Sequence, residues 1–223
     1  MGKVKDMVIY GAGGLGREIL SLLKRDYADV WRVIGFIDDS QDMPQEIDGV
    51  QLFSKDFLDG RDLAVVLGFA DPKLKAKVFK DLSGKRNLSF PNIISKNAYV
   101  TPDVRMEEGV IIADFCFISI NVSIGRIVFL NTFTTVGHDA VIGDFCSIMP
   151  STNISGHVVV GSETLLGAQS FILQGKKIGK SVSFAAGSKI FNDIPDNVAV
   201  FGNPAAIFKD NRINKGEVYN ERR

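Results

Sequence analysis

The chain has 223 residues, of which 45 % are hydrophobic, enough for one large domain or two modest ones with buried cores. Lysine and arginine together number 26, as do aspartate and glutamate, so no overall field favours nucleic acid or an anionic membrane. No apolar run approaches the ~18 residues that cross a bilayer, and the N-terminus lacks the apolar core of a signal peptide. We expect a cytoplasmic protein that binds a small polar metabolite, without a nucleic-acid or membrane partner.

Residues 7–90 alternate short β-rich runs with amphipathic segments, which is typical of a small βαβ domain with a parallel sheet. Pro91 and Asn92 break the pattern. We therefore predict a Rossmann-like α/β domain over residues 1–90. Its expected strands are 7–10, 33–37 and 64–67, and its expected amphipathic segments are 17–25 and 71–82.

A glycine-rich turn, Gly11-Ala-Gly-Gly-Leu-Gly16, lies between the first expected strand and the first expected helix. In this setting backbone N–H groups and the helix dipole hold a phosphate, whereas tight packing of strand against helix accounts for about one of the glycines. Asp38 lies 22 residues after Gly16, where dinucleotide folds place an acid on a ribose hydroxyl, so NAD binding is one reading. A domain of roughly eighty residues holds one mononucleotide half, and this favours a nucleoside diphosphate sugar.

From Ile94 to Ile190 every sixth residue is apolar, seventeen times in succession. Neither a helical period of 3.6 nor a strand period of 2.0 produces such a pattern. Six-residue repeats build a parallel β-helix, in which three hexads close one triangular coil and each inward residue stacks on the one eighteen positions later. The repeated residues are Ile94, Val100, Met106, Ile112, Ile118, Ile124, Leu130, Val136, Ile142, Ile148, Ile154, Val160, Leu166, Ile172, Ile178, Phe184 and Ile190.

The hexads run without an insertion, so we predict a straight prism of about five and a half turns over residues 91–201. Ile194-Pro195 and Asn203-Pro204 should stop the coil, leaving residues 202–223 as a cap or tail. From Lys209 onward this tail is charged and is expected to pack loosely or fray. Flat faces on a thin prism invite self-association, so we expect a homotrimer with parallel axes.

The two cysteines, Cys116 and Cys146, are both fifth in their hexads, on different faces of the prism. We interpret them as two buried free thiols. We expect no metal site.

The only two histidines, His138 and His157, follow inward residues that belong to the same face. His138 is third in its hexad and should point outward, and Asp139 beside it would raise its basicity, so His138 is a candidate general base. Asp139 and His157 are both fourth in their hexads and should stack about 4.8 Å apart on adjacent coils. We interpret His157 as a partner for Asp139 or a trimer contact.

Four segments carry a resemblance to the bacterial sugar O/N-acetyltransferases of the sialic-acid and nucleotide-sugar type, which include UDP-4-amino-sugar acetyltransferases. The segments are Tyr10-Gly-Ala-Gly-Gly-Leu-Gly16, Phe36-Ile-Asp-Asp39, Gly137-His-Asp-Ala-Val-Ile-Gly-Asp144 and Val200-Phe-Gly-Asn-Pro-Ala205. The resemblance implies a left-handed β-helix, a homotrimer, and acetyl-CoA as co-substrate in the cleft between neighbouring coils. It also implies a role in bacterial surface glycan biosynthesis.

The resemblance also assigns site residues. It implies that His138 is the catalytic base, with Asp139 and Asn131 beside it. Contacts to the nucleotide sugar are implied for Gly13, Gly14, Leu15, Asp38, Asp39 and Gly68. Contacts to acetyl-CoA are implied near Ser147, Ala168 and Ala186, where small residues let the pantetheine arm approach the backbone.

The chain departs from the family pattern at two positions. Many members carry a second histidine nine residues after the base, where this chain has Ser147, and a small residue where it has His157. We hypothesise that His157 supports Asp139 or partly replaces the missing histidine. A His157→Ala protein with unchanged kcat and KM for acetyl-CoA would exclude this.

The expected activity is direct N-acetylation of a nucleotide-linked sugar at its 4-amino group, with acetyl-CoA as donor and His138 as base. Alternatives are O-acetylation of sialic acid or another sugar, and a non-catalytic nucleotide-sensing trimer. A further reading, an NAD-dependent oxidoreductase, lacks a candidate for hydride chemistry in the solenoid. The acceptor sugar and its nucleotide base are left open.

Overall fold

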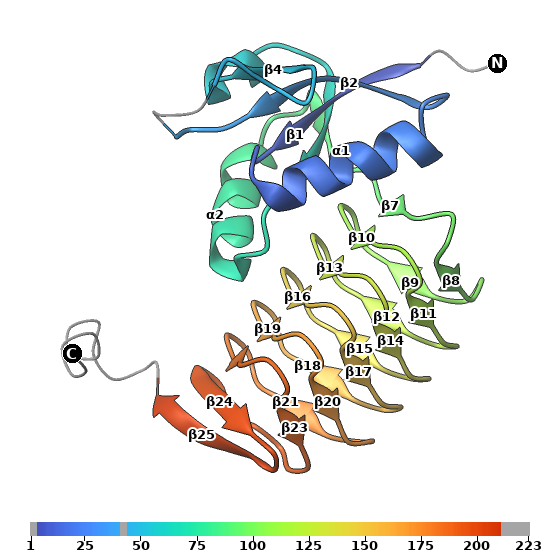
Figure 1. The fold of residues 1–223 in the computed structure, drawn as a ribbon, viewed down its shortest axis with the longest axis vertical. Coiled ribbons are helices and arrows are strands. Elements are labelled where there is room, and N and C mark those ends of the chain that lie inside the picture. Colours follow the sequence, from blue (N-terminus) through green and yellow to red (C-terminus); the bar gives the residue numbers. More distant parts are fainter. Residues whose placement is uncertain (1–3, 41–43, 211–223) are drawn as a thin grey trace.

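The computed structural model describes residues 4–40 and 44–210 as an α/β domain seated on one side of a long triangular coil (Figure 1). Among these residues no helix is both long and apolar enough to cross a membrane. The structure thus contains both the predicted α/β domain and the predicted β-helix.

The N-terminal domain contains a six-stranded sheet in the order β3-β4-β2-β1-β5-β6, parallel apart from the β3–β4 hairpin. The expected βαβ domain is confirmed. The sequence analysis did not predict β3, β4 or β6, which are only two to four residues long. The strands are β1 (Lys5–Tyr10), β2 (Trp31–Ile37), β3 (Glu46–Ile47), β4 (Val50–Phe53), β5 (Leu63–Leu67) and β6 (Leu88–Ser89), with a 3₁₀ turn at Lys55–Leu58.

Helices α1 (Gly14–Asp26) and α2 (Pro72–Leu82) each bury an apolar stripe. In α1 the stripe comprises Ile19 and Leu20, with Leu23 one helical turn later. The start of α2 is set by the Asp71 carboxylate, which accepts a hydrogen bond from the Leu74 N–H at 2.8 Å, and by proline in the first turn. Both helices begin within three residues of their predicted positions.

The coil is a left-handed parallel β-helix with seventeen two-residue strands, distributed six, six and five over three flat faces. The second residue of each strand is the repeated apolar residue, and each strand pairs with the one eighteen residues later, as predicted. The first face comprises β7 (Ile93–Ile94), β10 (Ile111–Ile112), β13 (Phe129–Leu130), β16 (Ser147–Ile148), β19 (Leu165–Leu166) and β22 (Ser183–Phe184). The second face comprises β8 (Tyr99–Val100), β11 (Phe117–Ile118), β14 (Thr135–Val136), β17 (Asn153–Ile154), β20 (Phe171–Ile172) and β23 (Lys189–Ile190). The third face comprises β9 (Arg105–Met106), β12 (Ser123–Ile124), β15 (Val141–Ile142), β18 (Val159–Val160) and β21 (Lys177–Ile178).

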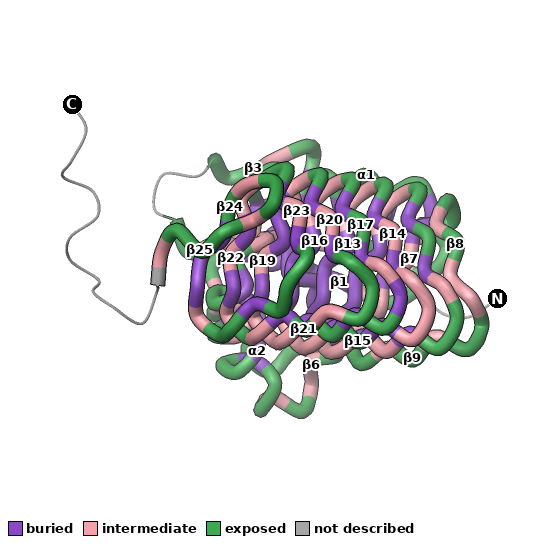
Figure 2. Tube along the Cα trace, turned by 90° about the horizontal axis from the view of Figure 1, so that it is seen from below, coloured by how far each residue is buried: buried purple, intermediate pink, exposed green. Residues whose placement is uncertain are grey.

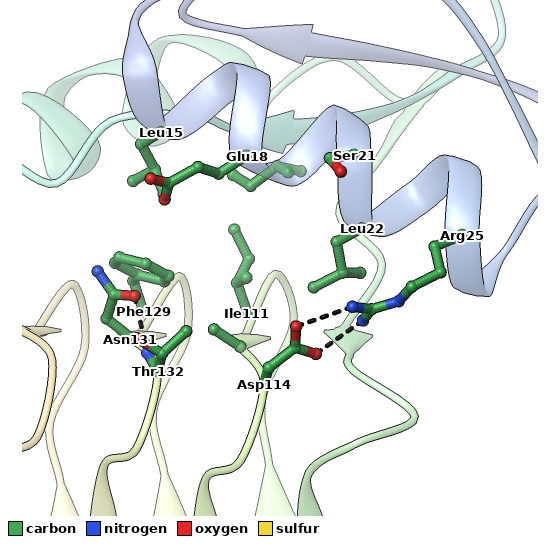
Figure 3. A pocket seen from close by; sticks show the side chains of 12 residues that line it. Leu15, Glu18, Ser21, Leu22, Arg25, Ile111, Asp114, Phe129, Asn131 and Thr132 are labelled. Atoms are coloured by element: carbon green, nitrogen blue, oxygen red, sulfur yellow. Dashed lines mark hydrogen bonds and ion pairs between the residues drawn. The ribbon is translucent and has the colours of Figure 1, made fainter.

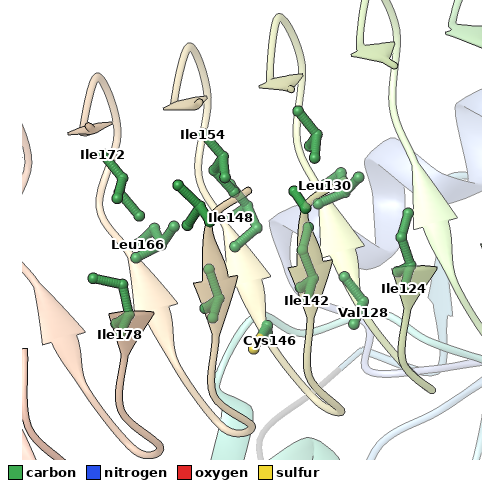
Figure 4. Close-up of a cluster of buried hydrophobic side chains, with 14 of the residues drawn as sticks. Ile124, Val128, Leu130, Ile142, Cys146, Ile148, Ile154, Leu166, Ile172 and Ile178 are labelled. Carbon is green, nitrogen blue, oxygen red and sulfur yellow. The ribbon is translucent and has the colours of Figure 1, made fainter. Parts of the chain in front are cut away.

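The interior of the coil is a ladder of aliphatic side chains from the three faces (Figure 4). Leu130, Ile148 and Leu166 from the first face have no exposed surface. Cys116 and Cys146 are buried free thiols in the same core, as predicted. Because burial contributes roughly 25 cal/mol per Å² of apolar surface, this continuous ladder is the main stabilising feature of the coil.

The corners of the coil have a left-handed backbone at every sixth residue from 109 to 187. Ile127, which is β-branched, and the aromatic residues Phe133 and Phe145 adopt this conformation, which costs such residues about 1–3 kcal/mol each. Hydrogen bonds between coils hold the corners in place: the N–H of each of these residues from 127 onward donates to a corner carbonyl one coil earlier, as Phe133 does to Asp114 at 3.1 Å. Stacked repeats therefore impose the corner geometry on residue types that would not adopt it alone.

The C-terminal end of the described chain differs from the prediction. Strand β24 (Val198–Gly202) extends the first face beyond Ile190, and β25 (Ala205–Asp210) pairs with it antiparallel. Lys209, expected to begin a loose tail, pairs with Ala199 because the Asn203-Pro204 turn reverses the chain into a hairpin. The rest of the predicted tail, 211–223, lies outside the described residues.

The N-terminal domain is fastened to the first face by apolar packing and polar contacts. Ile19 of α1 belongs to the same buried cluster as Ile111 and Phe129 of the coil. Arg25 donates hydrogen bonds to both carboxylate oxygens of Asp114, at 2.7 and 2.8 Å. Tyr27 donates its hydroxyl to the Ile94 carbonyl at 2.7 Å. These contacts place the glycine-rich turn, which opens α1, over the first face of the coil.

Lys75 of α2 forms the most buried polar contact between the two domains. Its side chain is 1 % exposed, and its Nζ donates to the carbonyls of Ile127 and Cys146, at 3.0 and 2.8 Å. Burial lowers the pKa of Lys75 from 10.5 to about 7. A neutral amine carries two hydrogens, one for each carbonyl, so both contacts survive deprotonation.

We predict that Lys75 makes stability rise with pH above neutrality. Between its folded pKa of about 7 and its ordinary value of 10.5, the unfolded chain binds more protons than the folded chain. The free energy of unfolding should therefore rise from pH 7 to 8.5, by at most about 1.4 kcal/mol per pH unit from this group, and be flat below pH 7. Urea denaturation of wild type and Lys75→Met measures this rise, which the variant should lack. Lys77→Met, on the exposed side of α2, should retain it; equal slopes for Lys75→Met and wild type would contradict the prediction.

Candidate active site

The glycine-rich turn lies at the carboxyl end of β1, which has β2 on one side and β5 on the other. Ligands of open α/β sheets bind outside this end of the strands, where the strand order reverses. Gly11, Gly16 and Gly68 pack together there: a Cβ on Gly16 would lie 2.0 Å from the Gly11 oxygen, and one on Gly68 would lie 2.7 Å from the Gly16 Cα. Three glycines thus have a packing role, including Gly68, for which a sugar contact was expected.

Gly13 and Gly14 differ from those three because they are exposed and a Cβ on either would meet open space. Gly13 is the N-cap residue of α1, and no side chain within residues 4–40 and 44–210 caps this end of the helix. The first backbone N–H groups of α1 therefore point toward solvent with the positive end of the helix dipole. This arrangement is suited to a phosphate.

The two predicted ribose-binding acids have different environments. Asp38 accepts hydrogen bonds from the Ala12 N–H at 2.9 Å and from the N–H and hydroxyl of Ser40. Burial raises the pKa of Asp38, but these hydrogen bonds outweigh it and leave the pKa below its ordinary value. Asp38 thus holds the glycine turn in place, while exposed Asp39 accepts the Tyr10 hydroxyl alone among the residues that the structure describes and keeps acceptor capacity there.

A cavity of about 240 Å³ separates α1 from the first face (Figure 3). Leu15 and Glu18 line it from the helix, and Phe129, Asn131 and Thr132 line it from the coil. Ligand sites usually have ~300–1,000 Å³, so this cavity would accept only one end of a nucleotide sugar. Leu15 and Asn131, predicted for different subsites, lie on its opposite sides.

His138 and Asp139 lie at the edge between the second and third faces, termed here the second edge. The His138 Nδ1 lies 2.7 Å from the Asp139 Oδ2, and the His157 Nε2 lies 3.7 Å from that same oxygen. The two imidazole rings meet edge to face, with centroids 4.9 Å apart. The expected proximity of Asp139 and His157 is therefore present, and His138 is 45 % exposed.

Asp139 belongs to a polar ladder along the second edge. The Asn121 N–H donates to Asp103 at 2.6 Å, and the Asn121 amide donates to the Asp139 Oδ1 at 3.3 Å. The hydrogen bond with His138 is the main cause of the lowered pKa of Asp139. Asp139 is thus ionised at neutral pH and accepts a hydrogen bond from the Nδ1–H group of His138, which leaves Nε2 as the basic nitrogen.

The His138 ring occupies space that only glycine leaves open. Gly156 lies one coil later, and a Cβ there would lie 2.6 Å from the His138 Nε2 and 2.7 Å from its Cε1. Sequence analysis missed Gly156 and Asn121; the eighteen-residue offset from His138 and Asp139 was the signal that could have found them.

The remaining predicted residues lie away from His138. Asn131, Ala168 and Ala186 occupy the edge between the first and second faces, termed the first edge, and the two alanines are half-exposed and exposed. Asn131 accepts a hydrogen bond from the neighbouring Thr132 N–H at 2.7 Å. Ser147 lies in β16 of the first face; its side chain is fully buried, and its hydroxyl has no hydrogen-bond partner among the described residues. Within a single chain the candidate base therefore lies apart from Asn131, which was predicted beside it, and from the residues predicted beside acetyl-CoA.

The chain is similar to proteins of known activity over most of its length. Residues 6–82 match the family model described as the PglD N-terminal domain. A GDP-perosamine N-acetyltransferase from Escherichia coli O157:H7 is 28 % identical over 219 residues, which cover 90 % of this chain and 95 % of that protein.

Two solved structures share the whole architecture. A histidine-to-asparagine mutant of perosamine N-acetyltransferase from Caulobacter crescentus, in complex with CoA and GDP-perosamine, is 27 % identical, with a TM-score of 0.84, over 93 % of this chain and 99 % of that one. The acetyltransferase domain of PglB from Neisseria gonorrhoeae, in complex with acetyl coenzyme A, has the same TM-score at 23 % identity, over 92 % of this chain and 100 % of that one, and shows the fold alone. These similarities support a sugar acetyltransferase of the bacterial hexapeptide-repeat type, and the chain is an acyl-CoA-dependent acyltransferase.

We predict that Gly156→Ala lowers the rate of acetyl transfer on the order of 10²-fold, because the added methyl group displaces the His138 ring. The fold should be retained, since the backbone at Gly156 is not left-handed and the clashing atoms belong to one movable side chain. Steady-state kinetics and the thermal unfolding midpoint measure the two effects. The neighbouring substitution Ser155→Ala is the matched control, and a normal rate in Gly156→Ala would show that the ring position does not matter.

Proposed function

We propose that the protein transfers the acetyl group of acetyl-CoA to the 4-amino group of a nucleotide-linked sugar, in bacterial surface glycan biosynthesis, with His138 as general base. Acetyl-CoA is the co-substrate of this acyltransferase. The proposed acceptor class is supported by two relatives whose names specify GDP-perosamine as substrate or ligand. The observation that carries the proposal is the His138–Asp139 hydrogen bond on an exposed edge of an acetyltransferase coil.

The acceptor site is proposed at the carboxyl end of the N-terminal sheet. The uncapped start of α1, at Gly13 and Gly14, supports diphosphate binding. Exposed Asp39 is suited to a ribose hydroxyl. The sugar would reach the cavity beside Leu15 and Asn131. Asp38 and Gly68 would belong to this site as residues that fix the conformation of the glycine-rich turn.

The proposed transfer is direct. The sugar nitrogen attacks the thioester carbon and forms the new C–N bond, while His138 Nε2 takes the proton that the nitrogen loses. Asp139 stabilises the resulting imidazolium through Nδ1. Backbone N–H groups stabilise the oxyanion, the C–S bond breaks, and the proton passes to the thiolate to give CoA. Acetyl-CoA would extend along Ala168 and Ala186 on the first edge. Ser147 would lie under it, buried in strand β16 of the first face.

We propose that the active protein is a homotrimer with the site between copies. The support is the distribution of residues within one chain: His138 lies on the second edge, while Asn131, Ala168 and Ala186 lie on the first. Packing the first edge of one copy against the second edge of another would unite them.

Exposed aromatic side chains beside the first edge support the same assembly. Tyr99 and Phe117 on the second face are 60 and 47 % exposed and stack with centroids 5.3 Å apart. Phe115 and Phe133 at the first edge stack at 5.1 Å. A soluble monomer rarely exposes clustered aromatic residues, so this patch is suited to a second copy.

We predict that Phe117→Asp yields a folded monomer without acetyl transfer, because the charge would be buried at the contact between copies. Sedimentation velocity gives the mass, and circular dichroism gives the fold. Val30→Asp, at a 42 % exposed position in the N-terminal domain, is the matched control and should remain trimeric. A Phe117→Asp protein that remains trimeric and active would contradict this interface.

The experiment that tests the function measures thiol release from acetyl-CoA with UDP-, GDP-, dTDP- and CMP-linked amino sugars and free sialic acid. Release with a nucleotide-linked amino sugar supports the proposal, and mass spectrometry of the product locates the acetyl group. Release with sialic acid alone would establish O-acetylation instead. No thiol release with any of these acceptors would favour a nucleotide-sensing trimer. Saturable NAD binding would instead support an NAD-dependent oxidoreductase.

His138→Ala and His138→Gln are the controls for mechanism in the same assay. General-base catalysis contributes roughly 10²–10⁴-fold, so both variants should lose turnover on that order. Binding of both substrates, measured by calorimetry, should persist because His138 acts on the transferred proton. Near-normal turnover in either variant would remove His138 from this role.

A further inference from the structure

The second edge brings together three side chains that can bind a metal ion. One ligand atom each from His138, Asp139 and His157 lies within 4.8 Å of the other two. The three side chains are 45, 36 and 56 % exposed, so they can rotate and exchange solvent for a ligand. We propose that this His138–Asp139–His157 triad binds a divalent transition-metal ion of the Zn²⁺ class and that the occupied protein is inactive in acetyl transfer.

The observed distances are close to those that coordination needs. Zn²⁺ holds nitrogen and oxygen ligands at about 2.0–2.2 Å, which places neighbouring ligand atoms about 3.3 Å apart in a tetrahedron. The Asp139 Oδ2 lies 2.7 Å from the His138 Nδ1 and 3.7 Å from the His157 Nε2. Small side-chain rotations therefore suffice, and the fourth position is left for water. Two imidazoles favour zinc, copper or nickel over calcium and magnesium.

The backbone already holds these ligands in place. The Asp139 N–H donates to Ile120 at 3.0 Å, and the His157 N–H donates to His138 at 2.8 Å, which ties the two adjacent corners together. The Asn121 amide holds the other carboxylate oxygen of Asp139. On the next coil the corner residue is Gly175, where a Cβ would contact none of the described residues, so the coil itself leaves room for a metal ion beside His157. A preorganised ligand set loses little freedom on binding metal.

Metal binding at the triad would stop the proposed reaction through either nitrogen of His138. A metal ion on Nε2 occupies the lone pair that accepts the proton. A metal ion on Nδ1 displaces its hydrogen, so the neutral ring carries its proton on Nε2 and is no longer basic there. Inhibition thus rests on the proposed function, whereas metal binding does not.

The binding test is a Co²⁺ titration of untagged protein followed by visible absorption, with Zn²⁺ as competitor. We expect one equivalent of Co²⁺ per chain, displaced by Zn²⁺. His157→Ala should weaken binding by at least about 10-fold, since one of three ligands is lost. Glu163→Gln is the matched control, because Glu163 is a carboxylate with the same left-handed corner backbone on the edge between the third and first faces, away from both histidines, and it should bind like wild type. The buried Cys116 and Cys146 do not compete.

The second measurement compares the acetyl-transfer rate of each protein with and without Zn²⁺, as a ratio to its own metal-free rate. Wild type and Glu163→Gln should be inhibited at Zn²⁺ concentrations that saturate the site, and EDTA should restore them. His157→Ala should show little inhibition at that concentration. Absence of stoichiometric Co²⁺ binding, or equal affinity in His157→Ala, would overturn the site. Equal inhibition of all three proteins would overturn the link to His138. A metal-free protein without transfer activity would count against the proposed function alone, because the Co²⁺ titration still decides the site.

Discussion

The eighteen-residue register between coils is the constraint on which the rest of the structure depends. Every strand pairs with the strand one coil later, and corner N–H groups donate across the same gap. A side chain therefore faces the residues eighteen positions away, whatever their chemistry. At the second edge this rule stacks Asn121, Asp139 and His157 into one polar ladder. It also makes Gly156 necessary for His138, since the ring extends over the next coil. A solenoid thus converts sequence spacing directly into a site.

The N-terminal domain uses the coil as a platform. Its apolar helix face merges with the outer surface of the first face, so one buried cluster contains Ile19 together with Phe129. Arg25, Tyr27 and Lys75 add polar contacts at both helices. These contacts orient the carboxyl end of the sheet, with its open glycines, toward the first edge. A nucleotide held there would point its substituent into the cavity between the domains, because that cavity is lined by Leu15 on one side and Asn131 on the other.

Two histidines, His138 and His157, flank one carboxylate at the second edge. Asp139 lies between two imidazoles and is kept ionised by the nearer one. Such a carboxylate can orient a general base, and the same donor set can hold a metal ion. The two uses compete for His138, so the chemistry of this edge would depend on the metal available. Asp139 and His157 have left-handed backbones, so the coil fixes where both side chains start.

The sequence by itself determined the features that follow from a local period. The hexads specified the coil, its number of turns, the inward residues and the outward direction of His138, because each repeat forms the same strand and corner. The alternation of strands and helices likewise specified a parallel βαβ domain.

Only the tertiary structure decided the rest, because it depends on contacts between segments far apart in the chain. Docking buried Lys75, 52 and 71 residues from its two carbonyl partners, and turned Arg25 toward Asp114. Packing of the glycine-rich turn requires glycine at position 68, because a Cβ there would clash with Gly16. The same packing brings Asp38 to the Ala12 N–H, from which it accepts a hydrogen bond. Docking of α1 on the first face likewise placed Leu15 across a cavity from Asn131, because that contact joins segments more than a hundred residues apart.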